Sequence, residues 1–214
     1  MEASFWHEKW KAGHIGFHID KPNPLLVSHI DKLQLKNNSR LFLPLCGKSL
    51  DIGYLLKCGF NVIGIELSEI AIEALFEQLT LEPKILEIDD FKLYQTHNLT
   101  IYVGDFFKLT AKTLGDIDAS YDRASLIALP LETRKLYSKH LTKITKNAPQ
   151  LAITLDYDQD ISKGPPFSVT PAELKQHYVQ QYKMECLESN FSEDGLKGKY
   201  PVTESAWLLK PLNQ

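Results

Sequence analysis

The amino-acid sequence predicts a single α/β domain built on a doubly wound, mostly parallel sheet. Two short and nearly all-apolar runs, at 40–45 and 61–66, have the composition of strands that are buried on both faces. A segment with helical spacing follows each run, at 49–58 and at 69–79. Strand, helix, strand and helix within about forty residues are typical of parallel βαβ units joined by right-handed crossovers.

The segment that precedes the first strand, 1–38, is expected to form a helical N-terminal extension. Its first part, FWHEKWKA, is predicted to be a short helix with Trp6 and Trp10 on one face, because they are four positions apart. A loop follows. Asn23 then caps a second helix that has Pro24 at its first position and one apolar stripe.

The rest of the chain continues the alternation of strands and helices. Its expected elements are a hairpin (91–94 and 99–103), a strand within SYDRASLIAL (120–129), a helix (132–146), a strand (150–157) and two short strands (183–189 and 204–210). There is no internal repeat, low-complexity segment or linker. We therefore expect the whole chain, 1–214, to be a single domain.

Composition excludes several classes of protein. The chain has 214 residues, 43% of them hydrophobic, and its 24 Lys and Arg against 27 Asp and Glu give a formal charge of -3, with no basic excess for nucleic acid. No apolar run reaches about 18 residues and no signal peptide opens the chain, so we expect a cytoplasmic protein that does not insert into membranes. Its three cysteines lack CxxC spacing, which argues against disulfides and a zinc site, and no metal is expected.

The turn after the first strand, PLCGKSLD, contains Gly47-Lys48-Ser49 and raises the question of a phosphate-binding loop. A P-loop needs a second glycine five positions before this one, so that successive backbone N–H groups curl around the phosphate. That position is occupied by Phe42, within the strand. The turn is therefore not expected to bind a nucleoside triphosphate.

Two acidic residues at strand ends favour an adenosine-containing cofactor instead. Glu66 ends the second strand about 20 residues after Gly47, where a carboxylate can accept hydrogen bonds from both ribose hydroxyls; the alternative is a solvated acid at a helix start. Asp105 ends a later strand and can accept from an adenine amino group. NAD and S-adenosylmethionine both fit, but pyrophosphate needs a wider glycine-rich turn than PLCGKSLD provides. A cofactor without phosphate is favoured.

Five segments resemble one family. FWHEKWKAGHIGFH, FLPLCGKSLDIGYL, GIELSEIAI, YDRASLIAL and GPPFSV are similar to the thiopurine S-methyltransferase family, most of all to its shorter bacterial-type members, and the similarity runs from about Phe5 to Trp207. It implies a seven-stranded Rossmann-like methyltransferase sheet and an extension, 1–38, that covers the cofactor site. It also implies S-adenosylmethionine as methyl donor, S-adenosylhomocysteine as product, action as a monomer and no metal.

Carried over by motif position, and together with the turn glycine and the adenine-side acid, the predicted cofactor-binding residues are Trp6, Trp10, Leu45, Gly47, Glu66, Asp105 and Arg123. The two indoles can face a sulfonium, whereas without the resemblance the hydrophobic face of an amphipathic helix would be the preferred explanation. Arg123 is also the predicted catalytic residue, because its permanent charge favours an acceptor thiolate. The alternative for Arg123 is an ion pair with Asp118 or Asp122.

The acceptor side is predicted from the same resemblance. Phe17 matches a substrate-stacking phenylalanine, and Pro166 in GPPF contributes a stiff apolar wall. Loop histidines, His14 and His18, are weaker candidates for a base. The segment SEDGLKGKYP lacks the second arginine that animal members have, and whether Lys197 or Lys199 replaces it is left open.

The leading hypothesis is an S-adenosylmethionine-dependent S-methyltransferase that acts on small aromatic or heterocyclic thiols such as thiopurines. One alternative keeps the cofactor and changes the acceptor to selenium or tellurium compounds, inorganic sulfide or small aliphatic thiols. Two alternatives belong to other classes: an NAD-dependent oxidoreductase, which the single-glycine turn disfavours, and a non-catalytic adenosine-ligand-binding protein.

Overall fold

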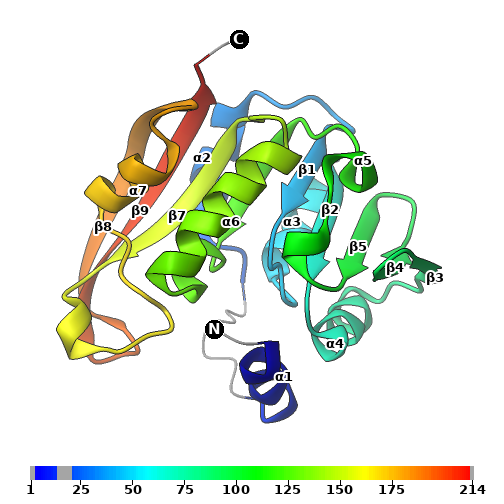
Figure 1. The fold of residues 1–214 in the computed structure, drawn as a ribbon, viewed down its shortest axis with the longest axis horizontal. Coiled ribbons are helices and arrows are strands. Elements are labelled where there is room, and N and C mark those ends of the chain that lie inside the picture. Colours follow the sequence, from blue (N-terminus) through cyan, green and yellow to red (C-terminus); the bar gives the residue numbers. More distant parts are fainter. Residues whose placement is uncertain (1–2, 14–20, 213–214) are drawn as a thin grey trace.

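The computed structural model describes residues 3–13 and 21–212, and its centre is one nine-stranded sheet with the order β3-β4-β5-β2-β1-β6-β7-β9-β8 (Figure 1). The strands are β1 (Arg40–Leu43), β2 (Asn61–Glu66), β3 (Lys84–Ile88), β4 (Phe91–Gln95), β5 (Leu99–Val103), β6 (Ala119–Arg123), β7 (Gln150–Asp156), β8 (Tyr182–Leu196) and β9 (Tyr200–Pro211). The α-helices are α1 (Ala3–Lys11), α2 (Pro24–His29), α3 (Leu50–Lys57), α4 (Glu69–Leu79), α5 (Ala111–Leu114), α6 (Leu131–Ile144) and α7 (Pro171–Tyr178).

The sheet confirms the α/β class, but it is mixed. Its central strands β5, β2, β1, β6 and β7 are parallel, whereas β3, β4, β8 and β9 join by antiparallel pairing. It has nine strands in place of the seven that the family resemblance implied. The sequence did not predict β3, because this edge strand has only exposed or half-buried residues and no apolar run to mark it.

Alternation along β1 shows how both faces of the sheet are buried. Leu41 and Leu43 belong to a core cluster that includes apolar residues of α2, α3 and α4. Phe42 faces the opposite cluster, which includes residues of α5, α6 and α7. Because successive side chains of a strand point to opposite faces, a nearly all-apolar run was the correct signal for a strand between two helical layers.

The described part of the extension 1–38 contains the helices α1 and α2. Asn23 caps α2 as predicted, since its side chain accepts from the N–H groups of Leu25 and Leu26, but the helix turns 3-10 over Ile30–Leu33. Leu25 and Leu26 are 2% and 0% exposed and lie in the core. Within the described residues of 1–38, α1 is the helix at the lower edge of the sheet in Figure 1.

Two expectations near the C-terminal half are corrected. The strand expected over 120–129 ends at Arg123, because Ala124 adopts a left-handed conformation with φ 60° and a 3-10 turn follows at Leu126–Ala128. The apolar residues 126–129 suggested a buried strand. They are buried, but most of them belong to the 3-10 turn. The two short terminal strands are instead a long hairpin, β8–β9, and β9 lies between β7 and β8.

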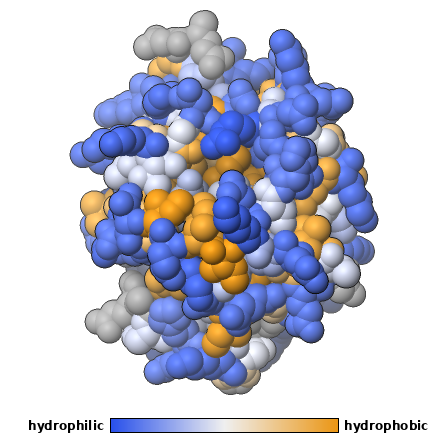
Figure 2. Space-filling view, turned by 90° about the vertical axis from the view of Figure 1, so that its right-hand side faces the viewer, coloured by the Kyte–Doolittle hydropathy of each residue, from blue (hydrophilic) through white to orange (hydrophobic). Residues whose placement is uncertain are grey.

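The face beyond the β3 edge is mostly hydrophilic, with hydrophobic residues gathered near its centre (Figure 2). Ile85 of β3 is 47% exposed. In the described part of the chain no helix is both long and apolar enough to cross a membrane.

Candidate active site

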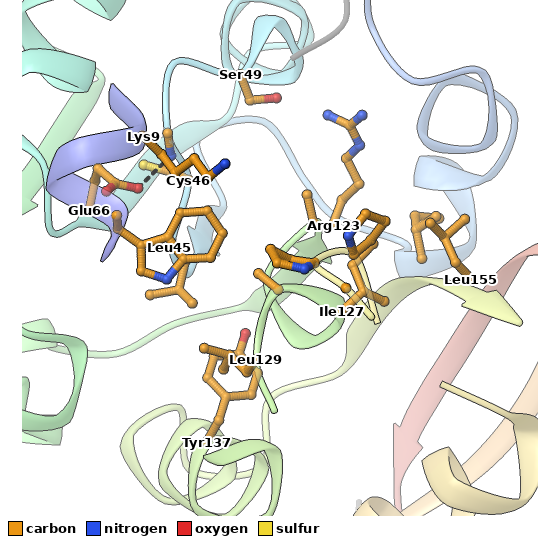
Figure 3. Close-up of a pocket in the computed structure, with 18 of the residues that line it drawn as sticks. Lys9, Leu45, Cys46, Ser49, Glu66, Arg123, Ile127, Leu129, Tyr137 and Leu155 are labelled. Carbon is orange, nitrogen blue, oxygen red and sulfur yellow. Dashed lines mark hydrogen bonds between the residues drawn. The ribbon is translucent and has the colours of Figure 1, made fainter. Parts of the chain in front are cut away.

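A pocket of about 1070 Å³ lies at the carboxyl ends of the parallel strands. Its walls come from α1, from the turns that follow β1, β2, β5 and β6, from the loop at 164–166 and from the β8–β9 hairpin. In Figure 3, Glu66 and Cys46 lie on one side of the pocket, while Arg123, Ile127 and Leu155 lie on the other. Ligands of open α/β sheets bind in this position, outside the carboxyl ends of the strands.

The turn after β1 is held by the protein's own groups. The Cys46 N–H donates to the Ile65 carbonyl at 3.0 Å, and the Gly47 N–H donates to Glu66 Oε2 at 2.9 Å. Leu45 and Gly47 have φ of 45° and 51°, which is the left-handed region. A Cβ at Gly47 would lie 3.1 Å from the Trp10 ring, so the indole of α1 packs directly on this turn. One N–H that a P-loop would give to phosphate is thus used by a carboxylate.

Glu66 is a buried residue of the pocket wall and not a solvated acid. Its side chain is at the end of β2, the residue is 6% exposed, and Oε1 accepts from the Ser68 N–H at 2.9 Å. Burial raises the pKa of Glu66, and the backbone donors at Ser68 and Gly47 lower it in part. Burial and the charge of Glu66 both raise the pKa of the neighbouring Cys46 thiol, which therefore stays protonated at neutral pH.

Arg123 forms its ion pair with a residue that sequence reasoning did not consider. Its Nη1 lies 3.9 Å from Asp51 Oδ2, on α3. Asp51 is 1% exposed and also accepts from the Tyr121 hydroxyl at 3.0 Å. The guanidinium therefore stands at the pocket wall beside a buried carboxylate.

A further carboxylate, Glu204 of β9, also lines the pocket. The Asn23 side-chain amide donates to Glu204 Oε1 at 3.3 Å, while the Asn23 N–H donates to Asp51 Oδ1 at 2.7 Å. Burial raises the pKa of Glu204, and the charge of Arg123 lowers it in part. The sequence did not reveal Glu204 because it opens the strand expected at 204–210, and a charged residue in that position is normally solvated.

Hydrogen bonds of Asp122 and Ser125 fix the carboxyl end of β6. Asp122 is 1% exposed and its carboxylate accepts from the Tyr137 hydroxyl at 2.7 Å and the Leu126 N–H at 3.2 Å. Burial raises the pKa of Asp122 to about 6. The Ser125 hydroxyl donates to the Pro44 carbonyl at 2.6 Å and so ties the turn after β6 to the turn after β1. These bonds hold the backbone of Arg123 in place.

The loop at 164–167 is anchored to two other segments of the chain, at Tyr157 and at Ile127. The Tyr157 hydroxyl donates to the Pro166 carbonyl at 2.5 Å, and the Phe167 N–H donates to the Ile127 carbonyl at 2.6 Å. Lys197 lines the pocket and donates to the Ser162 hydroxyl at 2.9 Å. Lys199 lies over the Tyr200 ring, 5.0 Å from its centroid, and is not among the lining residues.

The structure brings together nearly all of the residues that the sequence singled out. The pocket is lined by Trp6, Trp10, Leu45, Gly47, Glu66, Asp105, Arg123 and Pro166. Asp105 also caps a 3-10 turn by accepting from the Phe107 N–H at 2.9 Å. Phe17, His14 and His18 lie outside the described residues. Besides Glu204, the sequence missed Phe191, which lines the pocket although it is 64% exposed.

Comparison with known proteins identifies the family. A family model described as thiopurine S-methyltransferase (TPMT) matches residues 1–206. The chain belongs to this family. It is 48% identical over 209 residues to the thiopurine S-methyltransferase of Teredinibacter turnerae, covering 98% of this chain and 97% of that one. Its identity to the Gluconobacter oxydans thiopurine S-methyltransferase is 46% over 210 residues, covering 98% and 96%.

Solved structures agree on the fold. A Burkholderia thailandensis 1,6-didemethyltoxoflavin-N1-methyltransferase, solved with bound 1,6-didemethyltoxoflavin and S-adenosylhomocysteine, aligns with a TM-score of 0.65 at 13% identity, covering 96% of this chain and 86% of that one. An Anabaena variabilis methyltransferase aligns with a TM-score of 0.60 at 15% identity, covering 97% and 95%. The chain is therefore an S-adenosylmethionine-dependent methyltransferase of the TPMT family, with a small-molecule acceptor.

The lining residues suit this cofactor. Glu66 presents a carboxylate whose orientation is fixed by backbone donors, and carboxylate oxygens have lone pairs left for ribose hydroxyls. Indoles at Trp6 and Trp10 border the same space and can face a sulfonium. Across 3–13 and 21–212 no cluster of three or more His, Cys, Asp or Glu is placed to hold a metal ion.

Proposed function

We propose that this enzyme transfers the methyl group of S-adenosylmethionine to the sulfur of small aromatic or heterocyclic thiols, thiopurines among them. The observation that carries the proposal is the position of Arg123, a permanent cation in the wall of a largely apolar pocket that also holds Glu66. A guanidinium there stabilises a thiolate, and an apolar pocket accepts a flat ring. The proposal takes 1–214 as one methyltransferase domain that acts as a monomer.

The roles of the chain's own residues follow from their positions. Glu66 would accept hydrogen bonds from the cofactor ribose, and Asp105 would accept from the adenine amino group. Trp6, Trp10 and Leu45 would form apolar walls that exclude water, with the Gly47 turn as floor. When bound, the cofactor supplies a methyl group on a positively charged sulfur.

On the acceptor side, Arg123 would hold the sulfur as a thiolate, Pro166 would form one wall and Phe17 would stack on the ring. Alignment of the two reacting atoms is the main requirement, and positioning of this kind supplies up to about 7 to 11 kcal/mol in favourable systems. Lys197 is a better candidate than Lys199 for the second acceptor-side cation, because Lys197 borders the pocket.

A methyl-transfer assay with labelled S-adenosylmethionine tests the proposal against its alternatives. The acceptors are 6-mercaptopurine, thiophenol, selenite and sulfide, and wild type is compared with Phe17→Ala. We expect turnover of both aromatic thiols, with a loss of about fivefold in Phe17→Ala, the size of a lost ring contact of about 1 kcal/mol. S-adenosylhomocysteine affinity, measured by calorimetry, controls for folding of the variant.

Other outcomes identify the alternatives. Turnover of selenite or sulfide alone, unaffected in Phe17→Ala, would replace the aromatic acceptor by a small chalcogen acceptor. Tight S-adenosylhomocysteine binding without turnover of any acceptor would indicate an adenosine-ligand-binding protein.

A further inference from the structure

Glu204 lies at the acceptor end of the pocket, and the residues that hold cofactor and thiolate leave it without a role. In the sheet, Arg123 is paired with Ile153 of β7, and Leu155 of β7 is paired with Glu204 of β9. Paired residues share a face of a sheet, and so do residues two apart on one strand. The side chains of Arg123 and Glu204 therefore rise from the same face, one strand apart, and both line the pocket.

The surroundings of Glu204 combine one oriented donor with a nearby charge pair. Asn23, the cap of α2, donates from its amide to Glu204 Oε1 at 3.3 Å. The charged groups that act on Glu204 are Arg123 from β6 and Asp51 from α3, and these two are 3.9 Å apart from each other. Lys197 of the hairpin turn lines the same pocket but donates to the Ser162 hydroxyl.

This arrangement makes a proton acceptor. Asp51 offsets the positive charge of Arg123, so Glu204 is not fully compensated, and its burial makes the neutral carboxyl group easier to form. A buried carboxylate whose pKa is raised is a stronger proton acceptor than an exposed one, which suits it to receive a proton from a neighbouring thiol. Asn23 keeps one oxygen occupied and so limits rotation of the carboxylate.

We propose that Glu204 is the general base that removes the proton from the acceptor thiol, an inference that rests on the proposed function. The S–H bond breaks, its proton goes to a Glu204 carboxylate oxygen and its electron pair stays on sulfur. That pair forms the new sulfur–methyl bond while the donor sulfonium–methyl bond breaks and leaves its electrons on the donor sulfur. Glu204 then returns the proton to water.

The proton transfer leaves the total charge of the acceptor end unchanged. Thiol plus carboxylate and thiolate plus carboxylic acid have the same net charge, so the thiolate forms beside Arg123 without adding charge to an apolar pocket. An ordinary thiol with a pKa of about 8.5 gains most from this, because little of it is ionised at neutral pH. An acidic aromatic thiol enters already ionised and needs no base.

Two aromatic acceptors of different acidity separate these cases. Benzyl mercaptan has an ordinary thiol and 4-nitrothiophenol an acidic one, and kcat/KM is measured for wild type, Glu204→Gln and Glu204→Asp across pH. We expect Glu204→Gln to lower kcat/KM for benzyl mercaptan on the order of 100-fold, the size of general-base assistance, and to leave 4-nitrothiophenol nearly unchanged. Glu204→Asp keeps a carboxylate and should recover part of the loss.

The matched control is Glu185→Gln, the same chemical change on β8 at a side chain that is 59% exposed and outside the pocket lining. It should leave both acceptors unaffected. A readout without turnover uses thiophenol bound to the complex of enzyme and S-adenosylhomocysteine, because the ultraviolet absorption of the ring differs between thiol and thiolate. Glu204→Gln should hold thiophenol as the thiolate at a lower pH than wild type does, because the ionised Glu204 carboxylate of wild type disfavours a second anion beside it.

Equal losses for both acceptors in Glu204→Gln, or equal ionisation of bound thiophenol in both proteins, would overturn the role of Glu204 while leaving the methylation of thiols intact. Failure of wild type to methylate either thiol would overturn the proposed function and this inference with it.

Discussion

Gly47→Ala probes the contact between α1 and the turn after β1. Gly47 has φ 51°, and a Cβ there would lie 3.1 Å from Trp10 Cζ2 and 3.4 Å from Cη2. The variant has two costs. An alanine in the left-handed backbone conformation lowers the free energy of unfolding by about 1 to 2 kcal/mol. Crowding of a packed side chain lowers it by about 1 to 3 kcal/mol. Because α1 is a short helix that borders the pocket, we expect Trp10 to be displaced, which would relieve the crowding at the new Cβ.

Gly198→Ala isolates the first cost. Gly198 has φ 66°, and a Cβ there would have nothing within 4 Å. Both variants should lose about 1 kcal/mol in the free energy of unfolding measured with urea. Only Gly47→Ala should bind S-adenosylhomocysteine more weakly in calorimetry, by on the order of tenfold, which corresponds to about 1.4 kcal/mol.

A double variant completes the experiment. Shortening the indole in Trp10→Leu removes the ring atoms that the new Cβ would meet, so adding Gly47→Ala to Trp10→Leu should weaken S-adenosylhomocysteine binding little further. Equal affinities in Gly47→Ala and Gly198→Ala, or full additivity of Gly47→Ala and Trp10→Leu, would refute the view that α1 is positioned through this contact.

Two further predictions concern the titration of Asp122 and the role of Lys197. The native pKa of Asp122 is about 6, above the ordinary value of 3.8, so the native state keeps a proton that the unfolded chain loses, and stability falls by about 3 kcal/mol as pH rises through this window. Urea unfolding from pH 4 to 7 should show this fall in wild type relative to Asp122→Asn; a pH-independent difference would contradict it. Lys197→Ala should raise KM for an anionic acceptor while Lys199→Ala does not, and steady-state kinetics showing the reverse would remove Lys197 from the acceptor end.

The pocket residues at the ends of β1 and β2 were predictable from the sequence, because apolar runs mark these strand ends clearly. Leu45 and Glu66 each follow or end such a run, and parallel neighbouring strands bring their carboxyl ends to one edge. The turn at Gly47 was correctly excluded as a P-loop. What the spacing did not show is that Glu66 accepts from the turn itself at the Gly47 N–H.

The pocket wall around Glu204 was much less predictable, because it is assembled from distant segments. Asn23 and Glu204 are 181 positions apart, and their contact depends on β9 being inserted beside β7. Asp51 reads in sequence as an acid in the first turn of a helix, a solvated position, yet it is 1% exposed. No local pattern distinguishes such residues from surface charges. The edge strand β3 was not predicted because its side chains are exposed or half-buried, so the sequence has no apolar run there.

The order of the sheet has a consequence for how the enzyme is made. β9, Tyr200–Pro211, is the last strand to be synthesised, yet it is an interior strand between β7 and β8 (Figure 1). A nascent chain on the ribosome can form the central strands and the cofactor edge, but β8 has no neighbour and Glu204 does not exist until translation is nearly finished. The pocket is therefore completed only when β9 joins the sheet, and termination of translation upstream of β9 would leave β8 unpaired and the pocket without Val202 and Glu204.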